Sequence, residues 1–161
     1  MRVPLRALLL IAGVIVLASV PIAGPVAMAE QAPASFPPEF VAQLDKAKEI
    51  YVATERKDGT RSKPVPVWFG YMDNALWFTT SPGSHKGKRV KRGSPMWVSA
   101  QGENGPYIKT RAEVIRDGAI ADRLGAVYSQ KYWIAWLGLF RPNEERVRTG
   151  KTVLVKVVPE S

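Results

Sequence analysis

The sequence contains no cysteine and only one histidine, His85. The lack of cysteine excludes disulfides, thiolate metal sites and cysteine nucleophiles. A single histidine excludes zinc or copper centres built from several histidines, and it disfavours a Ser-His-Asp hydrolase. If the protein carries out a reaction, a bound cofactor is expected to supply the chemistry.

Acidic residues are also scarce. The chain has 14 Asp and Glu against 23 Lys and Arg, which gives a net charge of +9 over 161 residues. A positive charge of this size favours anionic partners such as nucleotides, phosphorylated cofactors, nucleic acids or anionic lipids. The composition, 46% hydrophobic and 23% charged, is typical of a folded globular protein, and the length fits one domain.

The N-terminal end has the pattern of an export signal. Arg2 and Arg6 precede an uncharged apolar run, and Ala27-Met28-Ala29 is a small-x-small cleavage site. Cleavage there would leave a mature chain that begins at Glu30 in the periplasm or outside the cell. The alternative is an uncleaved inner-membrane anchor formed by residues 7–29, which carry no charge and are about long enough to span a bilayer.

We therefore expect a signal peptide over residues 1–29, a proline-rich linker over 30–38 and one domain over 39–161. The domain is expected to begin with a short helix that carries Phe40, Leu44 and Ala47 on one face. Six stretches then have the composition of strands, namely Ile50–Thr54, Arg61–Tyr71, Ala75–Thr80, Met96–Gln101, Tyr107–Arg116 and Thr152–Val158.

Two further helices are expected between these strands. Ser84 is a suitable N-cap for a short basic helix over 85–92, and Asp117 can cap a helix that reaches about Trp133. Residues 138–150 are expected to form a loose connection. Because most of the strands follow one another through tight turns, the pattern predicts a mainly β fold, a six-stranded antiparallel barrel with small helices.

The stretch from Phe78 to Arg89 is the most informative for function. A strand ends there in hydroxyl residues, a glycine loop follows, and a cationic helix begins, so that hydroxyls, free N–H groups and Lys side chains can converge on one anion. This arrangement outlines a phosphate site. Five of the seven residues from Lys86 to Arg92 are basic, so a solvated helix face or a nonspecific patch for nucleic acid or anionic lipid is the alternative.

A second feature is the strand that carries Pro64, Pro66, Val67 and Trp68. Prolines at i and i+2 remove backbone donors from the same side of one strand, so that side must be an edge, a bulge or a ligand wall. Proline and tryptophan walls suit a flat ring. The alternative is an edge strand protected from aggregation, with the tryptophans serving as core.

The order of these motifs resembles the FMN-binding split-barrel superfamily, which includes pyridoxamine-phosphate oxidase-like proteins and deazaflavin (F420)-dependent reductases. The residues that carry the resemblance are Val52–Thr54, Asp58–Thr60, Pro64–Phe69, Leu76–Thr80 and Lys86–Pro95. The Lys-x-Lys-Arg pattern is more similar to the deazaflavin branch. The C-terminal Arg-rich substrate segment of the true oxidases is not found, so pyridoxamine oxidation is not implied.

The resemblance implies a split barrel that binds FMN or F420, which the sequence does not distinguish. The residues implied at the cofactor phosphate are Thr80, Ser84, Lys86, Lys88 and Arg89, with Thr79 also among the cofactor-binding residues, and those implied along the ring are Pro66, Val67 and Trp68. No catalytic side chain and no metal site are assigned. The resemblance also implies a homodimer, for which Tyr132, Trp133 and Trp136 are candidate contacts.

Two functions from different classes remain. The first is an exported FMN- or F420-dependent oxidoreductase that transfers hydride to a small substrate. The second is a non-enzymatic split-barrel module that binds an anionic or hydrophobic ligand, including haem through His85, or the envelope surface through residues 86–92. No nucleic-acid partner is expected, and no membrane contact after signal cleavage.

Overall fold

The computed structural model describes residues 35–138 and 140–160, apart from the side chain of Trp136. The signal peptide, its cleavage site and most of the expected linker lie outside the described residues. The helices are α1 (Pro38–Lys46), α2 (His85–Lys91), α3 (Gly118–Lys131), α4 (Trp133–Trp136) and α5 (Glu144–Arg148). The strands are β1 (Ile50–Thr54), β2 (Val65–Val67), β3 (Gly70–Met72), β4 (Ala75–Thr80), β5 (Met96–Ser99), β6 (Ile108–Ile115) and β7 (Val153–Pro159).

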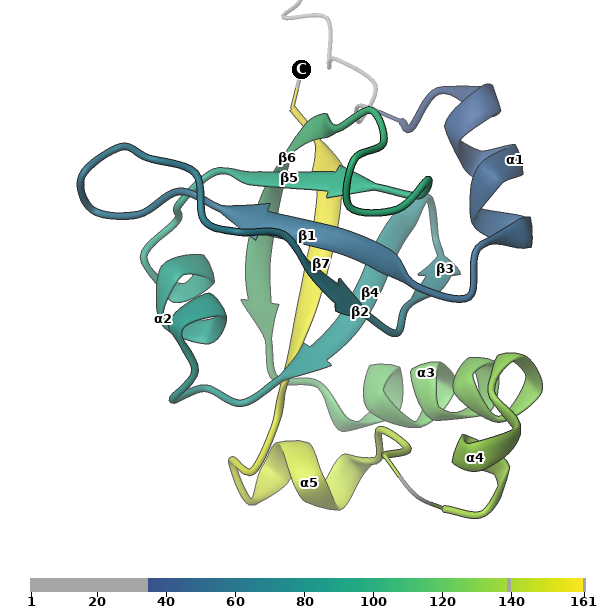
Figure 1. Cartoon of the computed structure of the whole chain (residues 1–161). Coiled ribbons are helices and arrows are strands. Elements are labelled where there is room, and N and C mark those ends of the chain that lie inside the picture. Colours follow the sequence, from purple (N-terminus) through teal and green to yellow (C-terminus); the bar gives the residue numbers. More distant parts are fainter. Residues whose placement is uncertain (1–34, 139, 161) are drawn as a thin grey trace, which may run out of the picture. The chain divides into compact units, whose positions relative to one another are not determined.

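The strands of the described region form one curled antiparallel sheet in the order β2-β1-β5-β6-β7-β4-β3 (Figure 1). A mainly β fold of the split-barrel type is therefore confirmed. The number of strands was wrong: there are seven, because the strand expected over 61–71 breaks at Trp68 and Phe69. Its first part, β2, pairs with β1, whereas its second part, β3, pairs with β4 at the other end of the sheet.

The two faces of the sheet carry separate clusters of buried side chains. Along β4, Leu76 and Phe78 point into the curl and pack with α1, while Ala75 and Trp77 point outward and pack against α3. This alternation follows from the two-residue period of a strand. Because α3 covers the outer face at β4 and β7, both faces of these strands are apolar, and four of the six residues of β4 are buried.

The core begins earlier than the sequence indicates. Phe36, which falls in the expected linker, is 3% exposed and its ring stacks on that of Phe40 with centroids 5.1 Å apart. Pro38 is the first residue of α1, a position where the missing N–H of proline is not needed. The predicted stripe is present, since Phe40 and Leu44 are buried, whereas Ala47 lies at the C-cap.

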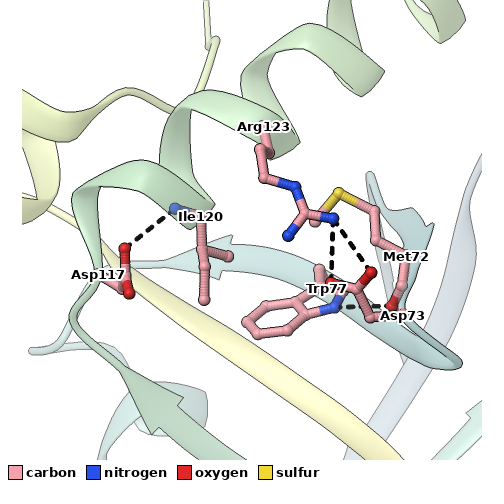
Figure 2. A network of polar contacts seen from close by, with 6 residues as sticks. All are labelled: Met72, Asp73, Trp77, Asp117, Ile120 and Arg123. Carbon is pink, nitrogen blue, oxygen red and sulfur yellow. Dashed lines mark hydrogen bonds and ion pairs between the residues drawn. The ribbon is translucent and has the colours of Figure 1, made fainter.

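Helix α3 is held in place by polar contacts at its start and its middle (Figure 2). The Asp117 side chain accepts a hydrogen bond from the Ile120 N–H at 3.1 Å, which confirms the predicted cap. Arg123 pairs with Asp73 at 3.0 Å, and Asp73 lies in the turn between β3 and β4. This turn has positive φ angles of 51° at Asp73 and 55° at Asn74, as tight hairpin turns require. The Arg123–Asp73 pair links α3 to the β3–β4 hairpin, whereas the Asp117 bond caps the helix itself.

The last part of the chain contains more helix than expected. Helix α3 ends at Lys131 and is followed by the single turn of α4, and α5 lies within the stretch expected to be loose. In Figure 1, α3, α4 and α5 lie together at one end of the strands, and α2 lies on the side away from α1. Within residues 35–138 and 140–160, the structure contains no helix with the length and apolarity that a membrane span requires.

Candidate functional site

The chain crosses from one edge of the sheet to the other at Trp68 and Phe69. Two tyrosines bind the backbone there: Tyr128 of α3 and Tyr132, the C-cap of α3. The Tyr128 hydroxyl donates to the Trp68 carbonyl oxygen at 2.6 Å. The Tyr132 hydroxyl accepts from the Phe69 N–H at 3.0 Å and donates to the Phe69 carbonyl oxygen at 3.2 Å. These hydroxyls supply hydrogen bonds that a neighbouring strand would otherwise make. We call this crossing the seam.

Both seam tyrosines remain protonated at neutral pH. Burial raises the pKa of Tyr128 well above its ordinary value and raises the pKa of Tyr132 to about 12. The Tyr132 ring also stacks on Trp68, with centroids 4.4 Å apart and planes 7° from parallel. Trp68 is therefore held both through its backbone and through its ring.

Trp68 forms one wall of a cavity of about 370 Å³, which we call the aromatic pocket. Its lining residues are Val67, Trp68, Thr79, Tyr128, Ile134 and Phe140. Three of them, Val67, Trp68 and Thr79, are residues that the resemblance implies at a cofactor. Most of the lining is apolar or aromatic, which suits a flat ring.

A second cavity, of about 260 Å³, lies between β1, β2 and the start of α2, and we call it the cationic pocket. Its lining residues are Val52, Thr54, Arg56, Ser62, Lys63, Val65, His85, Lys86 and Arg89. Four of these side chains are cationic and none of them is acidic. Since two hydroxyl groups also face the cavity, its lining suits an oxyanion such as a phosphate.

Lys86 is the most perturbed cation of this pocket. Its Nζ lies 5.1 Å from the centroid of the Phe78 ring, and burial lowers its pKa from 10.5 to about 8. Desolvation is the only cause of this shift, so no carboxylate within the described part of the chain offsets it. A bound anion would offset this desolvation. On the next turn of α2, Arg89 donates to the Thr54 hydroxyl on β1 at 3.2 Å.

The other residues implied at the cofactor are placed differently. Ser84 caps α2: its hydroxyl accepts from the Gly87 N–H at 3.0 Å, donates to the Ser81 carbonyl oxygen at 2.8 Å and lies 3.1 Å from the Thr80 hydroxyl. These bonds engage Ser84 within its own loop. Lys88 is exposed and lines neither pocket.

Strand β2 connects the two pockets. Val65 lines the cationic pocket and Val67 lines the aromatic pocket, on the same face of the strand and about 7 Å apart along it. Pro66 lies between them, so its side chain points to the opposite face, and it lines neither pocket. Of the alternatives that the sequence left open, the structure shows an edge: β2 is the first strand of the sheet, and an edge strand accommodates Pro66. A ligand with a phosphate and a ring can reach both pockets along this strand.

Sequence reasoning missed several residues that line the pockets. Arg56 and Lys63 enter the cationic pocket from the two sides of the β1–β2 connection, whereas Tyr128 reaches the aromatic pocket from α3. The short connection between the expected strands Ile50–Thr54 and Arg61–Tyr71 is a signal that could have brought Arg56 and Lys63 together. No local signal marks Tyr128, which lies 60 residues from its partner Trp68.

Comparison with known proteins gives one family match and a common fold. A family model described as pyridoxamine 5'-phosphate oxidase matches residues 36–161. An F420 reductase of solved structure is 21% identical, with a TM-score of 0.53, over 78% of this chain and 97% of that chain. An FAD and haem binding protein from Mycobacterium smegmatis is 20% identical, with a TM-score of 0.53, over 80% of this chain and 69% of that chain.

A third solved structure, general stress protein 26 from Bacillus anthracis, is 16% identical, with a TM-score of 0.53, over 75% of this chain and 86% of that chain. At these identities the likeness shows the fold alone. None of the curated protein sequences matches the chain. Among the residues that the structure describes, no group of three His, Asp or Glu side chains could hold a metal ion.

Proposed function

The chain belongs to the pyridoxamine 5'-phosphate oxidase family, and on this premise we propose that it is a flavin- or deazaflavin-dependent oxidoreductase that transfers hydride to a small substrate. The observation that carries the proposal is the pair of pockets along β2, one cationic and one aromatic. The first has the chemistry of a phosphate site and the second that of a ring site.

The cationic pocket would hold the cofactor phosphate. Lys86 and Arg89 lie one turn apart on α2 and both line the pocket, so they can bind one phosphate together. Lys86 is already desolvated before any ligand arrives. An anion that enters the pocket offsets this desolvation and makes charge-assisted hydrogen bonds, which are stronger than neutral ones.

The aromatic pocket would hold the ring. The two seam tyrosines fix Trp68 from behind, so the ring wall is in place before a ligand binds. FMN or F420 supplies hydride chemistry when bound, and the chain supplies position and the exclusion of water. This division of roles fits a chain without cysteine and with one histidine.

Titration of the purified full-length chain with FMN and with F420, in separate experiments followed by absorbance and fluorescence, tests the proposal. Lys86→Ala is expected to weaken binding by roughly ten- to hundredfold, because a charge-assisted contact of about 1.5–3 kcal/mol is lost. Lys91→Ala is the matched control: Lys91 ends the same helix, is exposed and lies outside the pocket. An equal loss in both variants would show a diffuse anion surface instead of a site.

His85 also lines the cationic pocket, and this favours a second candidate, a non-enzymatic module that binds haem or another anionic ligand. A haem titration with wild type and His85→Ala separates the two candidates. A haem spectrum that depends on His85, with no binding of FMN or F420, would support the non-enzymatic module and contradict the oxidoreductase.

We also propose that the protein acts outside the cytoplasm and that it is a homodimer. The first proposal rests on the signal pattern of residues 1–29 and the second on the resemblance to split-barrel proteins. Of the candidate dimer contacts, Tyr132 is buried at the seam and Trp133 is exposed, whereas the Trp136 side chain lies outside the described part. Light scattering with cofactor present tests the dimer, and a monomer at micromolar concentration would contradict it.

A further inference from the structure

The cationic pocket carries more positive charge than a terminal phosphate neutralises. Lys86 and Arg89 on α2 are the proposed phosphate contacts, but Arg56 and Lys63 line the same pocket from the β1–β2 connection. A terminal phosphate carries about two negative charges at pH 7. None of the lining residues is acidic, so two of the four positive charges remain in excess when such a phosphate is bound.

The two additional cations lie at the end of the pocket that is farther from the aromatic pocket. Lys63 comes four residues before Val67, the residue of β2 that lines the aromatic pocket. Lys86 instead lies beside the Phe78 ring, and Thr79, the next residue of β4, lines the aromatic pocket. A ligand whose ring occupies the aromatic pocket therefore reaches Lys86 before it reaches Lys63.

The Arg56 side chain is held in place by its own loop. Its Nη1 donates to the Thr60 hydroxyl at 2.9 Å and to the Arg61 carbonyl oxygen at 2.6 Å. Both acceptors are neutral, and Nε and Nη2 have no acceptor among the described residues. The Asp58 carboxylate accepts from Thr60 and forms no ion pair with Arg56 in this part of the chain. Arg56 is thus a fixed cation with donors left for a ligand.

Thr54 on β1 connects the two pairs of cations. This residue is 2% exposed, and its hydroxyl accepts from Arg89 on α2 at 3.2 Å. Its N–H donates to the Ser62 hydroxyl at 3.0 Å, and its carbonyl oxygen accepts from the Ser62 N–H at 2.9 Å. Ser62 directly precedes Lys63. Since α2 and the β1–β2 connection are both bonded to one buried residue, the backbone positions of the two pairs are fixed relative to each other.

Two pairs of cations in sequence along a ligand path suit two anionic groups in sequence on the ligand. On the premise of the proposed function, we propose that the cationic pocket binds a cofactor whose phosphate is internal, with Lys86 and Arg89 on this phosphate and Arg56 and Lys63 on a second anionic group. FAD carries that group as its second phosphate, and F420 carries it as the carboxylates beyond its phosphodiester. FMN ends at its phosphate and leaves the second pair empty.

Titrations of the full-length chain with FMN, FAD and F420 test this assignment. The Arg56→Gln/Lys63→Gln double variant is expected to weaken the binding of FAD or F420 by roughly tenfold or more, because charge-assisted contacts to the second group are lost. FMN should weaken by less than about threefold, since its one phosphate stays on α2. The cofactor that shows this dependence identifies the second group as a phosphate or a carboxylate. Lys86→Ala should weaken all three cofactors alike.

The matched control is the Lys57→Gln/Lys91→Gln double variant. It removes two positive charges from the same connection and the same helix, but both side chains are exposed and line neither pocket. Lys63→Gln alone guards against a loosened connection, because the Lys63 side chain makes no hydrogen bond or ion pair in the described part of the chain. As Lys63 is exposed, this single change should weaken the same cofactor by about two- to fivefold.

A second arm of the test uses ligands without a ring. Pyrophosphate and inorganic phosphate are compared at equal ionic strength through the urea midpoint of unfolding. Pyrophosphate should stabilise wild type more than phosphate does, because it can engage both pairs of cations. This difference should disappear in the Arg56→Gln/Lys63→Gln double variant and persist in the Lys57→Gln/Lys91→Gln control.

Three results would overturn the inference. The first is FMN binding that weakens as much as that of FAD and F420 in the Arg56→Gln/Lys63→Gln protein, because both residues then bind the one phosphate. The second is a loss no larger than in the control, which would make them solvated surface. The third is wild type that binds FMN but neither FAD nor F420. If no cofactor binds wild type, the proposed function fails, and the pyrophosphate arm still decides whether the second anion subsite exists.

Discussion

Lys86→Met is expected to make the ligand-free protein more stable although it removes the main proposed phosphate contact. Burial lowers the Lys86 pKa from 10.5 to about 8. At about 1.36 kcal/mol per pKa unit, this shift corresponds to a cost of about 3 kcal/mol for burying the charged side chain. The contact between the Lys86 Nζ and the Phe78 ring offsets about 1 kcal/mol of this cost. Methionine fills similar space without a charge, so we expect a gain of about 2 kcal/mol at pH 7.

The pH dependence provides a sharper signature. Between about pH 8 and pH 10.5 the folded wild type has released the Lys86 proton while the unfolded chain still holds it. Stability rises with pH wherever the unfolded state binds more protons, so the wild type gains stability across this window. Lys86→Met lacks this gain, and its advantage should therefore shrink as the pH rises from 8 toward 10.5.

Urea unfolding followed by circular dichroism, at pH 7 and at pH 10, measures both effects. Lys91→Met is the control, because Lys91 is exposed at the end of the same helix and its replacement should stay within about 0.5 kcal/mol of wild type. Inorganic phosphate should stabilise wild type more than Lys86→Met. If Lys86→Met is less stable than wild type at pH 7, or if Lys91→Met gains as much, the argument from desolvation is refuted.

Three further predictions concern other parts of the chain. Tyr132→Phe removes both hydrogen bonds to Phe69 and should lower the free energy of unfolding by about 1–3 kcal/mol, measured in urea. Gly87→Ala should also destabilise despite the higher helix propensity of alanine, by about 1–3 kcal/mol, because the added Cβ would collide with the Ser81 carbonyl oxygen. Protein secreted from a host with the export machinery should begin at Glu30, and intact-mass analysis checks this; a mass that includes residues 1–29 would support the anchor.

Local signals were sufficient for much of the fold. The strands Ile50–Thr54 and Ala75–Thr80 begin and end at the predicted residues, because β-branched and aromatic residues are bounded by turns on the chain itself. The predicted N-caps at Ser84 and Asp117 are also confirmed, since each side chain accepts a hydrogen bond from an N–H three residues later. These features depend on neighbours in sequence.

The features that were missed depend on distant partners. The run from Arg61 to Tyr71 is rich in strand-forming residues and was predicted as one strand, although Gly70 lies only two residues after Trp68. The structure divides it because β2 and β3 pair at opposite ends of the sheet. Helix α5 was missed as well: with five residues it is too short for a periodic signal, although Asn143 caps it through the Arg146 N–H.

The candidate site, like the fold, was predictable where it depends on neighbours in sequence. Lys86 and Arg89 are three positions apart on one short helix, so the sequence could place them on one face. The sequence could not show that Lys88 is exposed or that Arg56 completes the cationic pocket from the β1–β2 connection. Those facts follow from how α2 lies against β1, which is a tertiary contact.

The seam explains why the fold and the proposed ring site cannot be separated. The chain must leave one edge of the sheet and reach the other within two residues, and this leaves the backbone of Trp68 and Phe69 without a strand partner. Tyr128 and Tyr132, 60 and 63 residues away, satisfy that backbone. Tyr132 also stacks on the Trp68 ring, and Tyr128 meets that ring edge-on and lines the aromatic pocket. The contacts that close the split barrel at the seam therefore also position Trp68 as a wall of the aromatic pocket. A substitution that breaks the seam hydrogen bonds is expected to displace Trp68 as well.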